Sequence, residues 1–278
     1  MSENARDAYG ELAAVGPYGA GPGHALITLV EPHPGHEHAY NRWYEDDHFY
    51  AGAMAMPWIQ AGRRWVATRE LRSLRYPGHS AVADPVTAGC YLSVYWITEG
   101  RYGDHMRWTV AINRRLNRDG RVHHARTHVL TAFHDHAATV YRDGAAGPRD
   151  MHALDHPYAG LVLQVVDTDG PRRRAELLAW LREGHLPRRL RGSAAPLVTV
   201  FAPTPLPEDR MAHVRQVEGV GTRLTLLWFL EEDPARIWDP FFTGLGAEVA
   251  DAGLGRVELM APFIPTVPGT DRYVDQLR

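Results

Sequence analysis

The sequence has 278 residues, 45% of them hydrophobic, with 30 basic and 33 acidic side chains and a formal net charge of −3. This length fits one large domain or two ordinary ones, and the hydrophobic share is enough to fill a substantial core. The nearly balanced charge argues against the strongly basic surface of a nucleic-acid-binding or polybasic membrane-binding protein.

One cysteine, Cys90, limits the chemistry of the chain. An intrachain disulfide, a Cys-based zinc site and an iron–sulfur cluster all need more than one. We expect Cys90, at the start of an apolar run, to be a buried structural thiol. No apolar run approaches the length of a membrane span, and residues 1–7 lack the features of a signal peptide. The sequence therefore predicts a cytoplasmic protein with no membrane partner and no nucleic-acid partner.

Hydrophobic periodicity divides the first part of the chain into regular elements. Residues 1–23 are rich in Gly, Ala and Pro, and we expect them to form a flexible lead-in. The pattern then predicts a strand at 25–30, a helix at 37–54, strands at 59–68 and 90–98, a helix at 104–117, and a strand at 128–141. The order is β-α-β-β-α-β.

A second run of elements repeats that order. After a Gly- and Pro-rich break at 142–157, the pattern predicts a strand at 160–166, a helix at 171–190, strands at 197–202 and 222–230, a helix at 234–252 and a strand at 256–263. Trp43 and His48 are five residues apart near the end of the first helix, and Trp180 and His185 repeat that spacing in the second part. The sequence therefore predicts a tandem duplication, with units at 24–141 and 158–278 joined by a linker at 142–157.

The element order predicts the fold class, which is α+β. A βαββαβ unit is ferredoxin-like: it forms a four-stranded antiparallel sheet with both helices on one face. The bare face of each sheet must be covered, so we expect two tandem units to pack sheet to sheet as an α+β barrel. A cavity between the two sheets is then the natural place for a ligand.

A motif in the first unit resembles a known family. The run Tyr40-Asn41-Arg42-Trp43-Tyr44-Glu45-Asp46-Asp47-His48, followed by Pro57 and Arg63-Arg64-Trp65, is similar to the Asn-x-Trp-Tyr-x-x-x-His motif of the EthD-like branch of the dimeric α+β barrel superfamily. That superfamily includes polyketide cyclases, cofactor-free monooxygenases, muconolactone isomerases and haem proteins such as chlorite dismutases. The resemblance implies an enzyme that acts on small hydrophobic molecules, with a homodimer as one expected assembly.

Two departures from the family pattern bear on where the activity resides. Family members commonly have Leu-Pro directly after the histidine, whereas this chain has Phe49-Tyr50. The second unit has Leu181 where the first has Tyr44. We therefore expect the first unit to be active and the second to be its structural partner.

The candidate catalytic residues are His48, Tyr44 and Arg64. Tyr44 and His48 lie one helical turn apart and share a face. The helix dipole, together with Asp46 and Asp47, is expected to favour the cationic form of His48 or to orient its ring, so that it gives or takes a proton near neutral pH.

We expect Tyr44 to donate a hydrogen bond to a carbonyl group and an arginine to hold an enolate or carboxylate. Strand alternation sends Arg63 and Arg64 to opposite faces, and the resemblance favours Arg64. The alternative is structural: Trp43 and Tyr44 are core aromatics, and His48 only caps the helix.

Six further side chains are assigned to substrate binding: Trp43, Asn41, Tyr91, Tyr95, His134 and His136. The last two are two residues apart on a strand, so they face the same way, and with His128 they could line the barrel cavity. The alternative is an exposed edge strand.

Two loops also invite a functional interpretation. The loop at 33–38 contains three histidines that suit a transition metal, but a solvated polar loop is the favoured interpretation, so no metal is predicted. Residues 69–89 form a long connection, which we expect to be a lid over the cavity mouth.

The leading functional hypothesis is a cofactor-free lyase or isomerase of specialised metabolism, of dehydratase or cyclase type. It would act by proton transfer on a small apolar substrate, polyketide- or terpenoid-like, with His48 as base or acid. One alternative is a haem-dependent enzyme of the same superfamily in which a histidine binds the iron. The other is a non-catalytic protein that binds an apolar small molecule.

Overall fold

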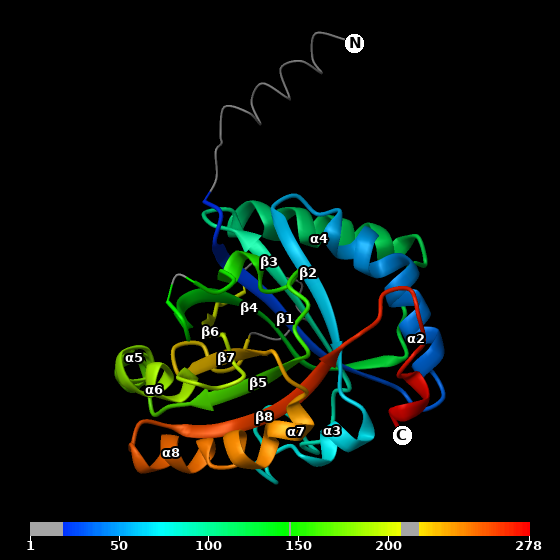
Figure 1. Ribbon diagram of the computed structural model, residues 1–278. Coiled ribbons are helices and arrows are strands. Elements are labelled where there is room, and N and C mark those ends of the chain that lie inside the picture. Colours follow the sequence, from blue (N-terminus) through cyan, green and yellow to red (C-terminus); the bar gives the residue numbers. More distant parts are fainter. Residues whose placement is uncertain (1–18, 145, 207–216) are drawn as a thin grey trace.

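The computed structural model describes residues 19–144, 146–206 and 217–278. Its strands are β1 (Pro22–Pro32), β2 (Ile59–Val66), β3 (Tyr91–Thr98), β4 (Arg126–Tyr141), β5 (Gly160–Asp167), β6 (Leu197–Pro203), β7 (Arg223–Leu230) and β8 (Arg256–Pro265). They form one closed barrel in the order β1-β3-β2-β8-β5-β7-β6-β4 (Figure 1). Each predicted strand is present, with ends that differ by at most three residues.

The barrel contains the same strand arrangement twice. The first four strands lie in the order β2-β3-β1-β4, and the second four in the order β8-β5-β7-β6, which is the ferredoxin-like arrangement in both cases. Pairing of β2 with β8 and of β4 with β6 joins the two sheets and closes the barrel. The predicted α+β barrel is therefore confirmed. The boundaries of the two units remain a prediction. Residues 1–18, most of the expected flexible lead-in, lie outside the described residues. Strand β1 begins two residues before the predicted start of the first unit.

Helices cover the outer faces of both sheets. In the first half, α2 (Glu37–Trp43) continues into the π-helical turns η1 (Tyr44–His48) and η2 (Tyr50–Met54), and α4 (Tyr102–Arg118) follows β3. Figure 1 shows α2 and α4 on the outside of the first sheet. None of the helices in the described ranges is long and apolar enough to cross a membrane.

The second half repeats this helical layer. There, α5 (Pro171–Trp180) continues into the π-helical turn η4 (Leu181–His185) and α6 (Leu186–Leu190), while α7 (Pro234–Ile237), η5 (Trp238–Phe242) and α8 (Leu245–Asp251) precede β8. A π-helical turn therefore ends at the paired histidine in each half, at His48 and at His185. The same local irregularity at the same point strengthens the case for a duplication.

The space between the two sheets is a packed core, so the expected barrel cavity was a wrong prediction. Inward-facing side chains from both halves are fully buried against one another, including Trp65, Trp96, Phe201, Phe229 and Phe263. An eight-stranded barrel is just wide enough for side chains to fill its interior. With several aromatic residues among the fillers, the interior of this barrel is occupied by its own side chains.

Two connecting segments complete that core. Ala153 and Leu154 of the 142–157 segment are buried in it, beside the short 3₁₀ turn η3 (Asp150–His152). From the 69–89 connection, which begins with α3 (Arg69–Ser73), Leu71 and Ala83 are buried in the same core. Arg75 holds this connection in place by donating to the carbonyl oxygens of residues 88 and 89, at 2.8 Å each. The connection is therefore part of the barrel packing, and the predicted lid was wrong.

Candidate active site between the helices and the first sheet

A cavity of about 280 Å³ lies between the outer face of the first sheet and the helical layer formed by α2, η1, η2 and α4. Its volume is close to the lower end of the range for small-molecule sites. The equivalent layer of the second half is filled by buried side chains, including Leu181, Leu186, Trp228, Trp238 and Phe242. The first half therefore has a mostly apolar cavity at this place, whereas the hollow beside Trp180 in the second half is more open and is lined by arginine and acidic side chains. The cavity is lined by Leu26, Thr28, Val30, Tyr40, Trp43, Tyr44, His48, Gly52, Ala53, Met56, Ile59, Tyr95, His105, Thr109, Asn113, Val122, Arg126, His128, Thr131 and Phe133.

His48 lies in the wall of this cavity, held between aromatic rings. Its imidazole stacks on the indole of Trp43, with centroids 4.4 Å apart and planes 20° apart, and Tyr44 meets it edge-on at 5.1 Å. Its Nδ1 is buried and has no hydrogen-bond partner. Gly52 leaves room for the ring, since a Cβ atom there would lie 2.3 Å from Nδ1.

The electrostatic environment of His48 differs from the one expected. Burial, with a contribution from Arg126, lowers the pKa of His48 to about 4. Asp47 does not orient the ring, because its carboxylate pairs with Arg121, and Asp46 pairs with Arg42. The expectation that the helix end would favour the cation was therefore wrong: His48 is a neutral imidazole at pH 7.

The hydroxyl groups of Tyr44 and Tyr95 form a hydrogen-bonded pair in the same wall, 2.7 Å apart. Burial raises the pKa of Tyr95 well above its ordinary value, so its hydroxyl stays protonated. Either hydroxyl can be the donor of this bond, and in the arrangement in which Tyr95 donates, the proton of Tyr44 is free for an acceptor in the cavity. Trp43, Tyr44, His48 and Tyr95, all singled out in the sequence, thus come together here.

Arg126 is a member of the site that sequence reasoning missed. Its guanidinium carbon lies 4.8 Å from the ring centre of Trp43, and its Nε donates to Nε2 of His128 at 3.1 Å. Its Nη1 is buried without a hydrogen-bond partner, and no carboxylate of the described ranges pairs with it. Residue spacing in the sequence could have pointed to Arg126. It lies two residues before His128 on β4, so the two side chains share a face of the strand.

Arg64 does not reach the cavity, which disagrees with the catalytic role that the resemblance gave it. Its side chain is buried, pairs with Glu45, and donates from Nη1 to Oδ1 of Asn41 at 3.1 Å. The guanidinium lies between the rings of Tyr44, at 4.3 Å, and Tyr91, at 4.8 Å. With its charge neutralised and both faces covered, Arg64 is placed to hold the helix on the sheet.

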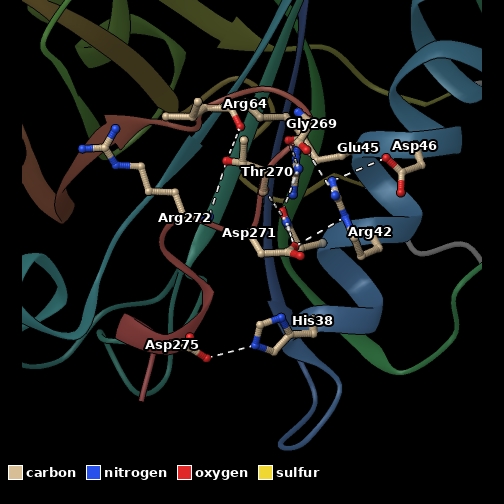
Figure 2. A network of polar contacts seen from close by, with 12 residues as sticks. His38, Arg42, Glu45, Asp46, Arg64, Gly269, Thr270, Asp271, Arg272 and Asp275 are labelled. Atoms are coloured by element: carbon tan, nitrogen blue, oxygen red, sulfur yellow. Dashed lines mark hydrogen bonds and ion pairs between the residues drawn. The ribbon is translucent and has the colours of Figure 1, made fainter.

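The other members of that contact hold the C-terminal segment, residues 266–278, against α2 (Figure 2). Asn41 donates to the carbonyl oxygen of Thr270 at 2.9 Å, and Glu45 accepts from the backbone NH of Gly269 at 2.8 Å. Tyr91 is buried in the same contact, in a cluster that includes Val274. Asn41 and Tyr91, predicted to bind substrate, therefore lie in a structural contact outside the cavity.

His134 and His136 share the inward face of β4, as predicted, but they belong to the barrel core. His134 is fully buried, with Nδ1 3.0 Å from the carbonyl oxygen of Ala132 and Nε2 3.2 Å from the hydroxyl of Thr225. His136 packs on Phe201. His128, six residues before His134, faces the opposite way because the β1–β4 register shifts between them. Neither His134 nor His136 reaches the cavity.

The histidines of the 33–38 loop are dispersed over separate contacts. His33 lies 3.3 Å from the hydroxyl of Thr127, and His38 pairs with Asp275 at 2.9 Å. Across the described part of the chain, no group of three or more Cys, His, Asp or Glu side chains is arranged to hold a metal ion.

Comparisons with known proteins bear on the fold. No protein-family model matches the chain, and no curated protein matches it. Among solved structures, an anthrone oxidase-like protein matches with a TM-score of 0.50 and 11% identity, covering 89% of this chain and 93% of that one. A variant of DypB from Rhodococcus jostii RHA1, in complex with heme, matches with a TM-score of 0.50 and 12% identity over 91% of this chain and 95% of that one.

A dye-decolorizing peroxidase from Bacteroides thetaiotaomicron matches similarly, with a TM-score of 0.51 and 11% identity over 90% of this chain and 94% of that one. The fold is that of the dimeric α+β barrel proteins. At these identities the likeness establishes architecture only, because one fold hosts many chemistries. Membership of the EthD-like branch stays a proposal that rests on the motif around His48.

Proposed function

We propose that the protein is a cofactor-free lyase or isomerase, of dehydratase or cyclase type, in which neutral His48 acts as the general base. The observation that carries this proposal is the placement of His48. A neutral imidazole lies in the wall of a cavity, stacked on Trp43 and met edge-on by the ring of Tyr44, whose hydroxyl group belongs to the same wall. His185 shares the neutral form, since its pKa is also lowered to about 4, so it is the mostly apolar cavity that distinguishes His48.

The reaction needs only proton transfer. His48 removes a proton from the carbon next to a carbonyl group, and Tyr44 donates a hydrogen bond to the oxygen as negative charge develops on it. In a dehydration, the electron pair then forms the carbon–carbon double bond while the β-hydroxyl group leaves with the proton from His48 as water. In an isomerisation or cyclisation, the proton returns to a different atom. The base is regenerated in each case.

The rest of the lining suits an aromatic substrate. Leu26, Met56, Ile59 and Phe133 supply apolar walls against which a flat molecule can pack. The sequence contains no lysine. Activation of a carbonyl group through a Schiff base to a lysine side chain is therefore not open to this enzyme. A small polyketide- or terpenoid-like carbonyl compound is the proposed substrate class.

The residues of the cavity do not fit a haem. An axial histidine must present a ring nitrogen to the iron, with room beside it for the whole macrocycle. One face of His48 is covered by Trp43, its Nδ1 lies against Gly52, and the cavity measures only about 280 Å³. The equivalent histidine, His185, is fully buried, with one face covered by Trp180 and Nδ1 3.5 Å from a carboxylate oxygen of Glu248. No step of the proposed reaction uses haem.

Turnover by matched histidine variants tests the proposal. In a screen of aromatic β-hydroxy ketones and related carbonyl compounds, we expect His48→Ala to lower kcat/KM by roughly 10²- to 10⁴-fold. His185→Ala, the same substitution in the other half, should leave turnover nearly unchanged, and Tyr44→Phe should give an intermediate loss. Equal, small effects of all three would disprove the catalytic role. Tight ligand binding without turnover would identify a binding protein instead.

A further inference from the structure

We propose that Arg126 forms a carboxylate-binding subsite in the His48 cavity, so that the ligand is an aromatic acid and not a wholly apolar molecule. This subsite rests on the proposed function, because it lies in the same cavity. The proposal adds that the guanidinium group of Arg126 recognises the substrate and that it selects a carboxylate substituent.

The first argument is an unneutralised charge. Arginine is seldom buried without a partner, because burial of an uncompensated charge is costly. Arg126 is half-buried in the cavity wall, its Nη1 is fully buried without a hydrogen bond, and its pKa is lowered by burial. A ligand carboxylate would supply the missing negative charge and accept the free N–H groups.

The second argument is that the carboxylates of the helix that Arg126 contacts through Trp43 are already occupied. Each acidic residue of α2 and η1 has an arginine of its own, none of which is Arg126. The pairs are Glu37 with Arg278, Glu45 with Arg64, Asp46 with Arg42, and Asp47 with Arg121. Recruiting any of them to Arg126 would break an existing ion pair. The charge of Arg126 is thus left available for a ligand.

The third argument is that the guanidinium is held in a fixed position. Trp43 covers it at 4.8 Å, and Nε2 of His128 accepts from its Nε. His128 is held in turn by a 2.8 Å hydrogen bond between its Nδ1 and the hydroxyl of Thr131. Because Nε2 of His128 accepts, its proton lies on Nδ1. These neutral contacts orient the cation without cancelling its charge, as a pre-organised binding site requires.

The position of the subsite fixes how a ligand would lie. Trp43 contacts both Arg126 and His48, so the carboxylate subsite and the base lie at neighbouring points of one wall. A carboxylate at Arg126 would therefore bring the attached aromatic ring into the apolar part of the cavity, beside His48. The cavity volume of about 280 Å³ suits a ligand of two fused rings better than a larger one.

Binding of matched probes tests the subsite without any turnover. Naphthoate carries a carboxylate, and naphthamide has the same shape without the charge. Calorimetry at pH 7 should show that the wild-type protein binds naphthoate about tenfold more tightly than naphthamide, or better. Arg126→Gln should abolish this preference. Arg121→Gln, which removes a nearby arginine that already has a carboxylate partner, should preserve it.

Several outcomes would overturn the subsite. These are equal affinity of the wild-type protein for the two probes, no naphthoate binding at millimolar concentration, or a preference that survives Arg126→Gln. If Arg126→Gln does not fold, Arg126→Lys keeps the charge but loses the guanidinium donors, and it should show a weakened preference; an unchanged one would contradict the proposal. Since binding is measured directly, failure of His48→Ala to affect turnover would refute the proposed function and leave this result standing.

Discussion

The imidazole of His48 stacks on Trp43 with ring planes 20° apart and centroids separated by 4.4 Å, and His185 stacks on Trp180 at the same angle and 4.1 Å. Each histidine ends a π-helical turn in the helix that follows the first strand of its half. Such turns are frequent at functional sites. The two halves differ in what surrounds the pair: a mostly apolar cavity lies beside His48, whereas the hollow beside Trp180 is more open and is lined by arginine and acidic side chains.

The space beside His48 depends on Gly52. In an ordinary helix Gly→Ala is stabilising by about 1 kcal/mol. At Gly52, however, a Cβ atom would overlap Nδ1 of His48. We therefore expect Gly52→Ala to lower the melting temperature, to displace the imidazole and to lower turnover.

Gly184→Ala is the control for this substitution, because a Cβ atom at Gly184 meets nothing within 4 Å. Thermal unfolding and turnover of the two variants can be compared directly. If Gly52→Ala behaved like Gly184→Ala, the placement of His48 against Gly52 would be wrong.

Stability should fall in mild acid because several histidines are buried in the neutral form. Burial lowers the pKa of His48 and His185 to about 4 and that of His134 to about 3, from 6.5 in the unfolded chain. Between pH 6.5 and 4 the unfolded chain therefore binds more protons, so the free energy of unfolding decreases as the pH falls, by up to about 1.4 kcal/mol per histidine and pH unit.

Urea unfolding between pH 7 and pH 4.5 measures this effect. His134→Gln removes one of the titrating groups, so its stability should depend less steeply on pH than that of the wild-type protein. A stability that stayed constant over this range would show that these histidines are not buried as neutral groups.

One substitution in the helix–sheet cavity and one in the barrel core, made separately, show in which of the two places the ligand binds. Ala53→Phe adds a ring in the helix–sheet cavity, and we expect it to abolish binding of naphthoate. Phe201→Ala opens the barrel core instead, and should cost about 3–5 kcal/mol of stability while leaving that binding intact. Calorimetry of both variants gives the affinity for naphthoate, and urea unfolding gives the free energy of unfolding. The reverse pattern, with binding lost only in Phe201→Ala, would place the ligand between the sheets.

The fold was largely predictable from the sequence because local patterns determine it. Alternation along the strands and the repeated element order gave eight strands in two units, and the Trp–His spacing placed the two histidines at equivalent points. Whether the barrel holds a cavity is not a local property. It depends on how many large side chains, such as Trp65 and Trp96, point inward at once.

The site was only partly predictable for a related reason. Tyr44 and His48 follow from helical spacing, whereas the roles of the arginines depend on which carboxylates the fold brings to them. Glu45 neutralises Arg64, and no described carboxylate neutralises Arg126. The face on which His128 lies is set by a shift in strand register that no sequence pattern marks. Burial of His48, which reverses the effect expected from the helix end, is also a property of the whole fold.

The most direct test of the central claim is the pH titration of the His48 imidazole, followed by NMR and assigned by comparison with His48→Ala. A general base must be neutral at the working pH, and the buried ring is expected to titrate with a pKa of about 4. Its signals should then keep the neutral shift from pH 8 down to about pH 5. A pKa of 6.5 or above would show that the ring is open to water or paired with an acid, and would contradict the account of His48 as a buried neutral base.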